Sequence, residues 1–355
     1  MNVSELYSAR SVAAHWTEAA SNRIPYLGAN WFPSRKKQGI DIKDIRAHKG
    51  LAVSLAPSNF DATSTLRARE GFRVEEKEMA FFRESMLLKE RDEQDIARIV
   101  DADDPYAADV MSRIYDDADT LLAGAEVVAE RMRMQLLCPD VDGSPRILIA
   151  SDNKQYSYNY DIDGSYATNN YKAMSGTSMW TDATNADPLA DLETAINAAV
   201  ENTGTRPVIA LMNTATFNAM KKSEKVKSAV LAQNITANVY MNSTRVKELV
   251  KNELGLTIII YDKQFKDEAG VVTKFYKDGF VALLPEGELG TTWYGVTPEE
   301  RTLNGKTDAN VSIIGEGVAV VVKITEDPVN TKTTVSEIVL PSFERMEETY
   351  VLKVF

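Results

Sequence analysis

The feature that most constrains the fold is the segment between Pro105 and Pro139, which holds no other proline and only one glycine. Asp104 is a favourable N-cap with Pro105 as the first helical residue, and Cys138-Pro139 ends the helix. Apolar residues recur every three or four positions, at Val110, Ile114, Ala118, Leu121, Ala125, Val128 and Met132. This pattern predicts one helix over residues 105–137 with a continuous apolar stripe, about 48 Å long at about 1.5 Å per residue.

So long a helix exceeds the diameter of a typical small domain, and we expect it to run across the molecule. A coiled-coil dimer is the alternative. The stripe carries two alanines and only about three heptads, which favours packing on a sheet instead. The full length of 355 residues suggests two to three domains.

The first 45 residues are predicted to form an arm rather than a domain. Ser4 is a candidate N-cap for a helix over about residues 5–20, whose apolar face includes Trp16. Prolines and glycines then interrupt regular structure around Trp31 and Phe32. Such a segment cannot bury large aromatics on itself, so either the body of the chain or a neighbouring chain must bury them. Trp16, Trp31 and Phe32 are therefore candidate intersubunit contacts.

A polar ribbon follows the arm. Residues 51–56 are predicted to be a strand. Two alternating stretches, Thr63–Arg69 and Phe72–Met79, flank Glu70-Gly71 and predict a hairpin. A polar hairpin of this kind is only marginally stable by itself. It is therefore either a solvated surface hairpin or an extended arm that pairs with charges on another subunit. The candidate contact residues here are Arg67, Arg69, Glu70, Arg73, Glu75 and Glu76.

The rest of the chain alternates strands and helices. Residues 146–160 are predicted as strand and 163–185 as a loop. An α/β unit comes next, with helices over 188–201, 214–221, 223–233 and 243–254 and buried strands at 208–212 and 256–261. A hairpin turns near residues 268–270, and a strand follows at 280–284. The turn-rich segment 286–317 precedes strands at 318–324 and 335–355. The fold class is therefore α+β.

Catalytic, cofactor and metal residues are not predicted anywhere. The only histidines are His15 and His48, and the single cysteine, Cys138, sits at a helix C-terminus, which is the wrong end of a helix for stabilising a thiolate. Cys138 is predicted to be a small buried residue. The net charge of −12 disfavours a protein that grips DNA phosphates. Apolar runs are too short to cross a membrane. The first residues show neither a basic start nor an apolar signal core, so we do not expect secretion.

Three short motifs have weaker functional interpretations. Gly305-Lys306-Thr307 matches only the end of a phosphate-binding loop, because Glu300 stands where the first glycine is needed. The run from Asn159 to Gly164 resembles half of a calcium loop, but Asn170 replaces the bidentate glutamate, so a polar turn is favoured. Arg35-Lys36-Lys37 is interpreted as a solvated or intersubunit patch.

Four stretches resemble a known family. They are Gly50–Pro57; Glu193–Ala198 with Val208–Met212 and Phe217; Phe275–Phe280 with Leu289–Gly295; and Glu326–Pro328 with Val339–Pro341. Together with the order of elements, they make the chain similar over nearly its whole length to the lambda-type major capsid proteins of tailed bacteriophages, the phage major capsid protein E family. That family has the Hong Kong 97-type capsid fold.

The resemblance implies a specific domain plan. Residues 1–45 would be the N-terminal arm, and 46–82 the extended loop that lies over a neighbouring subunit. Residues 83–182 and 320–355 would form the peripheral domain, with 105–138 as its spine helix. Residues 183–319 would be the axial domain.

The resemblance also implies a structural protein of the virion, not an enzyme. Its copies would form pentamers and hexamers of an icosahedral shell that encloses double-stranded DNA without sequence-specific binding. Assembly would take place in the host cytoplasm with a separate scaffolding protein and a portal protein. The resemblance does not decide whether a decoration protein covers the shell. The alternatives are an encapsulin-like shell that holds cargo enzymes and, more remotely, an enzyme built on the α/β unit.

Overall fold

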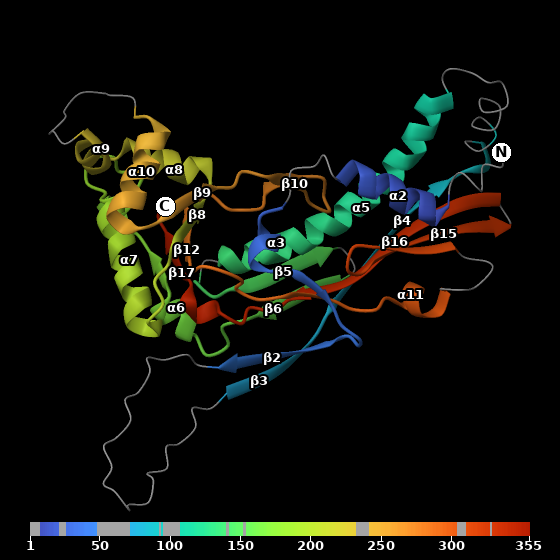
Figure 1. Cartoon of the computed structure of the whole chain (residues 1–355), viewed down its shortest axis with the longest axis horizontal. Helices are drawn as coiled ribbons and strands as arrows, with labels where there is room; N and C mark the ends of the chain where they lie inside the picture. The colour runs from blue at the N-terminus through green and yellow to red at the C-terminus, as the bar shows by residue number, and fades with distance from the viewer. Residues whose placement is uncertain are drawn as a thin grey trace, which may run out of the picture. The chain divides into compact units, whose positions relative to one another are not determined.

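The fold is seen in a computed structural model, which describes residues 8–20, 26–47, 72–91, 94, 107–139, 142–151, 154–231, 241–303, 310–326 and 329–355 (Figure 1). The chain divides into two compact units, each assembled from separate stretches. Unit 1 comprises residues 1–43, 76–132 and 290–342, and unit 2 comprises residues 44–75, 133–289 and 343–355.

Unit 1 is built on a six-stranded sheet whose central member is β16 (Val329–Pro341). On one side β16 pairs with β15 (Val318–Glu326), which pairs in turn with β14 (Asn310–Ile314). On its other side β16 pairs along most of its length with β4 (Ala80–Leu88) and at its end with β13 (Thr292–Tyr294). Strand β1 (Ser34–Lys36) joins β13 in parallel. Three distant stretches of sequence therefore meet in one sheet.

Two helices cover one face of that sheet. The long helix α5 (Ala107–Leu137) and the shorter α2 (Ala9–Ala20) bury apolar residues against β15 and β16. The residues of this core are Ala9, Val12, Trp16, Ala118, Leu121, Leu122, Ala125, Val320, Val322 and Val335. The predicted helix is thus confirmed from residue 107, including its end before Cys138-Pro139 and its packing on a sheet, while Asp104 and Pro105 lie outside the described residues. Cys138 is buried, as predicted.

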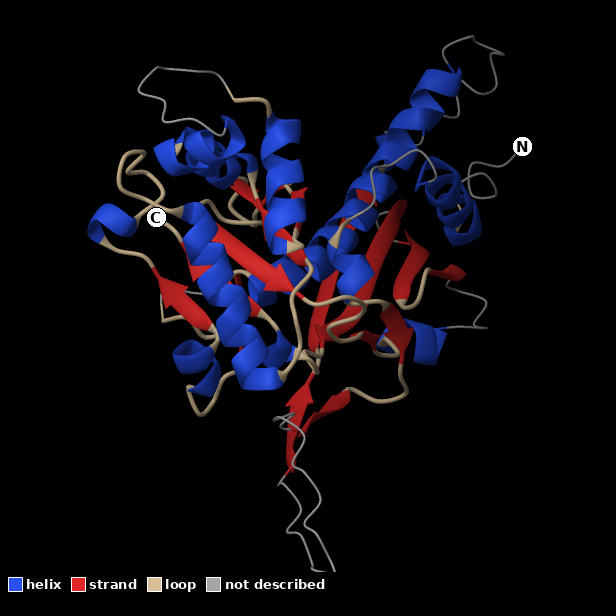
Figure 2. Cartoon of the chain, turned by 60° about the vertical axis from the view of Figure 1, so that its left-hand side comes forward, coloured by secondary structure: helices blue, strands red, loops and turns tan. Residues whose placement is uncertain are grey.

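Unit 2 contains a five-stranded sheet in the order β7-β17-β12-β8-β9. Figure 2 shows its strands in red with helices beside them in blue. These strands are β7 (Tyr171–Ala173), β17 (Tyr350–Lys353), β12 (Phe280–Leu284), β8 (Ile209–Met212) and β9 (Thr257–Ile260). Helices α7 (Pro188–Thr203), α8 (Thr214–Lys222), α9 (Glu224–Leu231) and α10 (Ser243–Leu254) share one apolar core with the sheet. The predicted α/β unit is therefore confirmed.

Local signals explain where these helices begin and end. Asp187 accepts a hydrogen bond from the Ala190 amide at 3.2 Å and caps α7, whose first residue is Pro188. Gly204 and Gly255, at φ +73° and +71°, end α7 and α10 in the left-handed conformation that glycine adopts without strain.

Smaller elements complete the described chain. In unit 1 they are α3 (Gly28–Trp31) and α11 (Pro298–Leu303). In unit 2 they are the hairpin of β5 (Arg146–Ser151) and β6 (Lys154–Asn159), the helix α6 (Ser165–Asn169), and the hairpin of β10 (Gln264–Lys266) and β11 (Val272–Lys274). Strands β2 (Asp41–Ala47) and β3 (Phe72–Glu78) pair as a separate two-stranded sheet.

Strand pairing divides the chain differently from the predicted domain boundaries. The final strand, β17, pairs with β12 and β7 in unit 2, although residues 320–355 were expected to stay together. Strands β13 and β14 pair within unit 1, although residues 183–319 were expected to form one domain. Strand β3 pairs with β2, and its expected partner at residues 63–69 lies outside the described residues. Partner choice between distant strands leaves no local trace in the sequence.

Two Gly→Ala substitutions in unit 1 should have opposite effects. A β-carbon on Gly290 would overlap the carbonyl oxygen of Ser342, so Gly290→Ala should lower the free energy of unfolding by about 1–3 kcal/mol. Gly124 is exposed in α5 with open space around it, so Gly124→Ala should raise it by about 0.5–1 kcal/mol. Chemical denaturation of the two variants measures both. Equal stabilities would contradict the close approach at Gly290.

Candidate functional site

The aromatic residues predicted to contact a neighbour are buried inside their own unit. Trp16 is 3% exposed, Trp31 4% and Phe32 0%. Trp16 belongs to the core that α5 and the unit 1 sheet share. Of the two alternatives that the sequence left open, the structure shows burial on the chain's own body, so these three side chains offer a neighbour almost no surface.

The segment around Trp31 and Phe32 is held by polar contacts as well. The Gly28 amide donates to the buried carboxylate of Glu130 at 3.0 Å. The Thr292 hydroxyl donates to the carbonyl of Phe32 at 2.9 Å. Strand β1 also pairs with β13 of the unit 1 sheet. Most of the described part of the predicted arm is therefore an integral part of unit 1.

The charged contact candidates lie on or beyond strand β3. Arg67, Arg69 and Glu70 lie outside the described residues. Arg73 and Glu75 belong to the first part of β3, residues 72–75, for which only the backbone is described. Glu76, in the same strand, is exposed. Their role in contacts between subunits stays a prediction.

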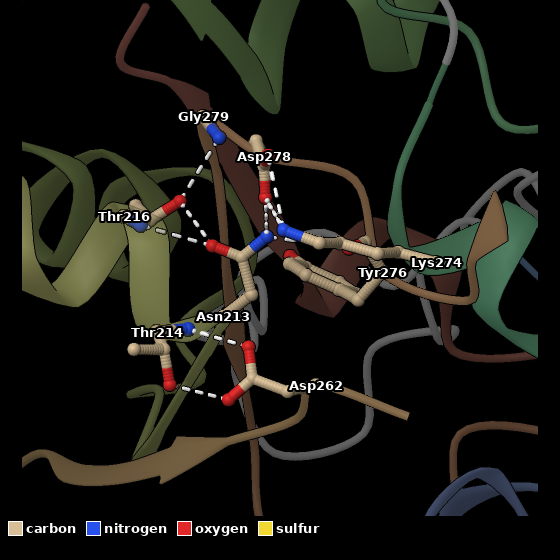
Figure 3. Close-up of polar contacts among 8 residues, drawn as sticks. All are labelled: Asn213, Thr214, Thr216, Asp262, Lys274, Tyr276, Asp278 and Gly279. Carbon is tan, nitrogen blue, oxygen red and sulfur yellow. Dashed lines mark hydrogen bonds and ion pairs between the residues drawn. The ribbon is translucent and has the colours of Figure 1, made fainter. Parts of the chain in front are cut away.

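The carboxyl ends of two parallel strands in unit 2 carry a polar cluster (Figure 3). Strands β8 and β9 are parallel, so the residues that follow them, Asn213 and Asp262, reach the same edge of the sheet. Ligands of open α/β sheets commonly bind at such an edge. The cluster was not predicted, and the signal that would have found it is the polar residue soon after each buried strand.

Asn213 is the centre of this cluster and is fully buried. Its Oδ1 accepts hydrogen bonds from the amide and the hydroxyl of Thr216 at 2.9 and 2.8 Å, which caps helix α8. Its Nδ2 donates to the Tyr276 carbonyl at 3.4 Å and to the Asp278 carboxylate. The Thr216 hydroxyl in turn accepts from the Gly279 amide at 2.9 Å.

The outer members of the cluster are also paired. Asp262 accepts from the amide of Thr214 at 2.8 Å and from its hydroxyl, and Lys274 donates to Asp278 at 2.8 Å. Burial raises the pKa of the Tyr276 phenol well above its usual value, so this ring stays neutral. The carboxylates and the amide are thus used to fasten the segment from Asp262 to Gly279 onto β8 and α8. The cluster is a structural brace and not a preformed ligand site.

The calcium-like run from Asn159 to Gly164 is a polar turn, as predicted. The buried Asp161 carboxylate accepts from the amides of Tyr166 and Ala167 at 3.0 and 2.9 Å at the start of α6. Asn159 accepts from the Asp161 amide, and Asp163 accepts from the Ser165 amide. Their side chains satisfy backbone donors, which is the usual role of Asx residues in turns.

Other candidate motifs also resolve into internal contacts. Lys36 of the basic triplet pairs with Glu300 at 2.6 Å, and Lys37 donates to the carbonyl of Asp41 at 2.9 Å. Residues 304–309, with the loop-like Gly305-Lys306-Thr307, lie outside the described residues.

In the described part of the chain, no group of three or more His, Cys, Asp or Glu residues is placed to hold a metal. None of the described helices combines the length and hydropathy that crossing a membrane requires.

The comparison with protein families is decisive. The model of the family described as phage major capsid protein E matches residues 8–354. The chain belongs to the phage major capsid protein E family. It is a major capsid protein, a structural component of the phage virion and not an enzyme.

Solved structures agree on the fold of this capsid protein. A prophage protein of Escherichia coli CFT073 described as a capsid protein is 12% identical with a TM-score of 0.57, over 98% of this chain and 99% of the other. A phage-related protein of Bordetella bronchiseptica RB50 is 13% identical with a TM-score of 0.51, over 96% of both chains. The search of curated proteins found no match. The predicted Hong Kong 97-type capsid fold is thereby confirmed.

The brace in this capsid protein can be tested by removing its central residue. Asn213→Ala removes the α8 cap and leaves Thr216 and Asp278 without their buried partner, so the free energy of unfolding should fall by about 1–3 kcal/mol. Asn218 lies exposed on the same helix, and Asn218→Ala should change stability by less than about 0.5 kcal/mol. Denaturant unfolding of both variants provides the measurement, and similar losses in both would argue against the brace.

Proposed function

We propose that this capsid protein assembles as pentamers and hexamers into the icosahedral head shell that encloses packaged double-stranded DNA. The single observation that carries the proposal is the family match over residues 8–354, which leaves almost no part of the chain for another activity. Assembly in the host cytoplasm, a separate scaffolding protein and a portal protein belong to the same proposal. A decoration protein is left open.

Within this proposal the two units have separate roles. The sheet of unit 1 with α5 is the peripheral domain, and α5 is its spine helix. The α/β part of unit 2 is the axial domain, which surrounds the five-fold and six-fold axes. The edge strands described for the unit 1 sheet are β1, β4 and β14. Each pairs on one side only, which leaves backbone groups available to other chains.

The extended loop is assigned to the chain between strands β2 and β3. These strands pair with each other and with no other described strand. A polar two-stranded ribbon is marginally stable alone, so contacts with a neighbouring subunit are the natural source of additional stability. We therefore keep Arg67, Arg69, Glu70, Arg73, Glu75 and Glu76 as the contact candidates.

The negative charge of the chain favours a shell that encloses DNA over a protein that binds DNA. A net charge of −12 repels phosphates at long range, so a shell wall of such subunits would keep the packaged duplex from adhering. An encapsulin-like shell is the second candidate, and the family match favours the phage capsid over it. Electron microscopy of particles formed with a scaffolding protein, followed by analysis of their contents, separates DNA from cargo protein.

Removal of the loop between β2 and β3 tests its assignment. The region to remove is residues 48–71, replaced by a short Gly-Ser turn. The deletion must spare Met79, because its side chain is 3% exposed and its amide donates to Ile40 at 2.7 Å. We expect a subunit with unchanged unfolding temperature that forms no closed shells, as seen by electron microscopy.

A matched control replaces the same residues with a Gly-Ser linker of equal length. It keeps the reach of the loop but removes its side chains, so closed shells should also be lost if side-chain contacts are needed. Normal particles from the deletion variant would refute the extended-loop assignment.

A further inference from the structure

Charge is strongly segregated along unit 2. Residues 174–205, which include α7, contain five acidic residues and no lysine or arginine. Residues 220–251, which include α9 and most of α10, contain seven basic residues and two acidic ones. The chain as a whole has a net charge of −12, so the second segment departs from the average in sign.

One exposed row on α7 carries two of these five acidic residues. Glu193, Asn197 and Glu201 are spaced four residues apart, so they lie on one face of the helix, and all three are exposed. The opposite face of α7 is buried in the core of unit 2. The side chains of Glu193 and Glu201 make no hydrogen bond or ion pair within the described part of the chain. We call these three residues the acidic row.

The basic charge gathers where α8 ends and α10 begins. The Lys221 ammonium donates to the Ser243 hydroxyl at 3.0 Å, and Lys221 and Lys247 both lie over the Phe217 ring, at 5.8 and 5.7 Å from its centroid. Lys222, the last residue of α8, and Arg245, in the first turn of α10, are both exposed. Among the described residues neither has an ion-pair partner. We call Lys222 and Arg245 the basic junction.

Glu201 and Arg245 occupy the unfavourable ends of their helices. Arg245 lies in the first turn of α10, next to the positive end of the helix dipole, and Glu201 lies in the last turn of α7, next to the negative end. Each charge therefore destabilises its own helix, and no contact within the described chain offsets this. Departures from a local rule are expected where a residue serves function.

We propose that, within a ring of subunits, the acidic row of one copy docks on the basic junction of the next copy. The inference rests on the proposed assembly into pentamers and hexamers, and it names the contact that joins the axial domains. Two different surfaces that fit each other form a head-to-tail contact, and such contacts produce a ring when the rotation between neighbouring copies closes. In Figure 1, α7 runs down the left side of unit 2 while α8, α9 and α10 gather at its top, so the two surfaces do not overlap.

A second copy fits the basic junction better than nucleic acid does. The acidic row supplies carboxylates on a rigid helix, and it is present in every neighbour at the same concentration as the junction. DNA would have to approach a subunit whose net charge of −12 repels it. Opposite charges across a contact mainly set partner choice and association rate, so this contact should weaken as salt is added.

Charge reversal tests the contact with variants that should fold well. Glu201→Lys and Arg245→Glu each place a charge that suits its helix end. In the second variant the new carboxylate would also stand three residues after the Asn242 cap, which is the capping-box arrangement. Neither variant should unfold at a lower temperature than the parent chain. Each alone reverses one of the two charges on its surface, which cancels the net charge of that surface and places like charges at positions 201 and 245 across every interface. We therefore expect about tenfold fewer rings and shells, or fewer still.

The double variant E201K/R245E provides the decisive experiment. Positions 201 and 245 then carry opposite charges again at every interface, with their signs exchanged, so assembly should return toward the parent level. Lys266, exposed on β10, provides the control, and Lys266→Glu should assemble normally. Rings are counted by analytical ultracentrifugation and shells by electron microscopy after expression with a scaffolding protein.

Each other outcome has a definite meaning. Single variants that assemble like the parent chain, or a double variant as defective as the single ones, would overturn the contact. Arg245→Glu shells that form normally but lose DNA would also overturn it, because the junction would then serve nucleic acid. A parent chain that forms neither rings nor shells would overturn the proposed function together with this inference.

Discussion

The pairing of β16 with strands on both sides is the interaction on which unit 1 depends. Along its length β16 pairs with β15 on one side and with β4 on the other, and it ends against β13. It therefore holds together segments that are more than two hundred residues apart in the chain, since Ala80 lies opposite Val339. The core beneath α2 and α5 exists only because this strand brings Val335 beside Val320.

Buried polar groups then fix the segments that the sheets alone do not hold. Glu130 on α5 accepts from the Gly28 amide, and Glu299 accepts from the buried Ser336 hydroxyl at 2.8 Å while pairing with Arg83. In unit 2 the Asn213 cluster plays the same part for the segment that ends at Gly279. A buried polar group is costly without a partner, so each such contact selects one arrangement of distant segments over its alternatives.

Local patterns in the sequence predicted the helices well and the pairing of strands poorly. Helix α5 and the cap of α7 at Asp187 depend on residues within a few positions of each other, so their signals can be read directly. The partner of β17 depends on which distant strand leaves an edge free, and the spacing of residues in the sequence does not indicate which strand that is. The burial of Trp31 and Phe32 was left open for the same reason, because their partners include Gly290 and Thr292, far along the chain. The polar cluster was missed because its members meet only after β8 and β9 pair.

The charges of unit 2 divide into those that serve folding and those that do not. Helix α7 begins with Asp187 and Asp191, and α8 ends with Lys221 and Lys222, all placed as the helix dipole favours. The far end of α7 and the start of α10 break the same rule with Glu201 and Arg245. Because neighbouring helix ends follow the rule, Glu201 and Arg245 do not reflect a general tolerance of charges that oppose the helix dipole. A subunit that must join many identical copies needs exposed charges whose partners lie outside it, and the folded monomer bears the small loss of helix stability that results.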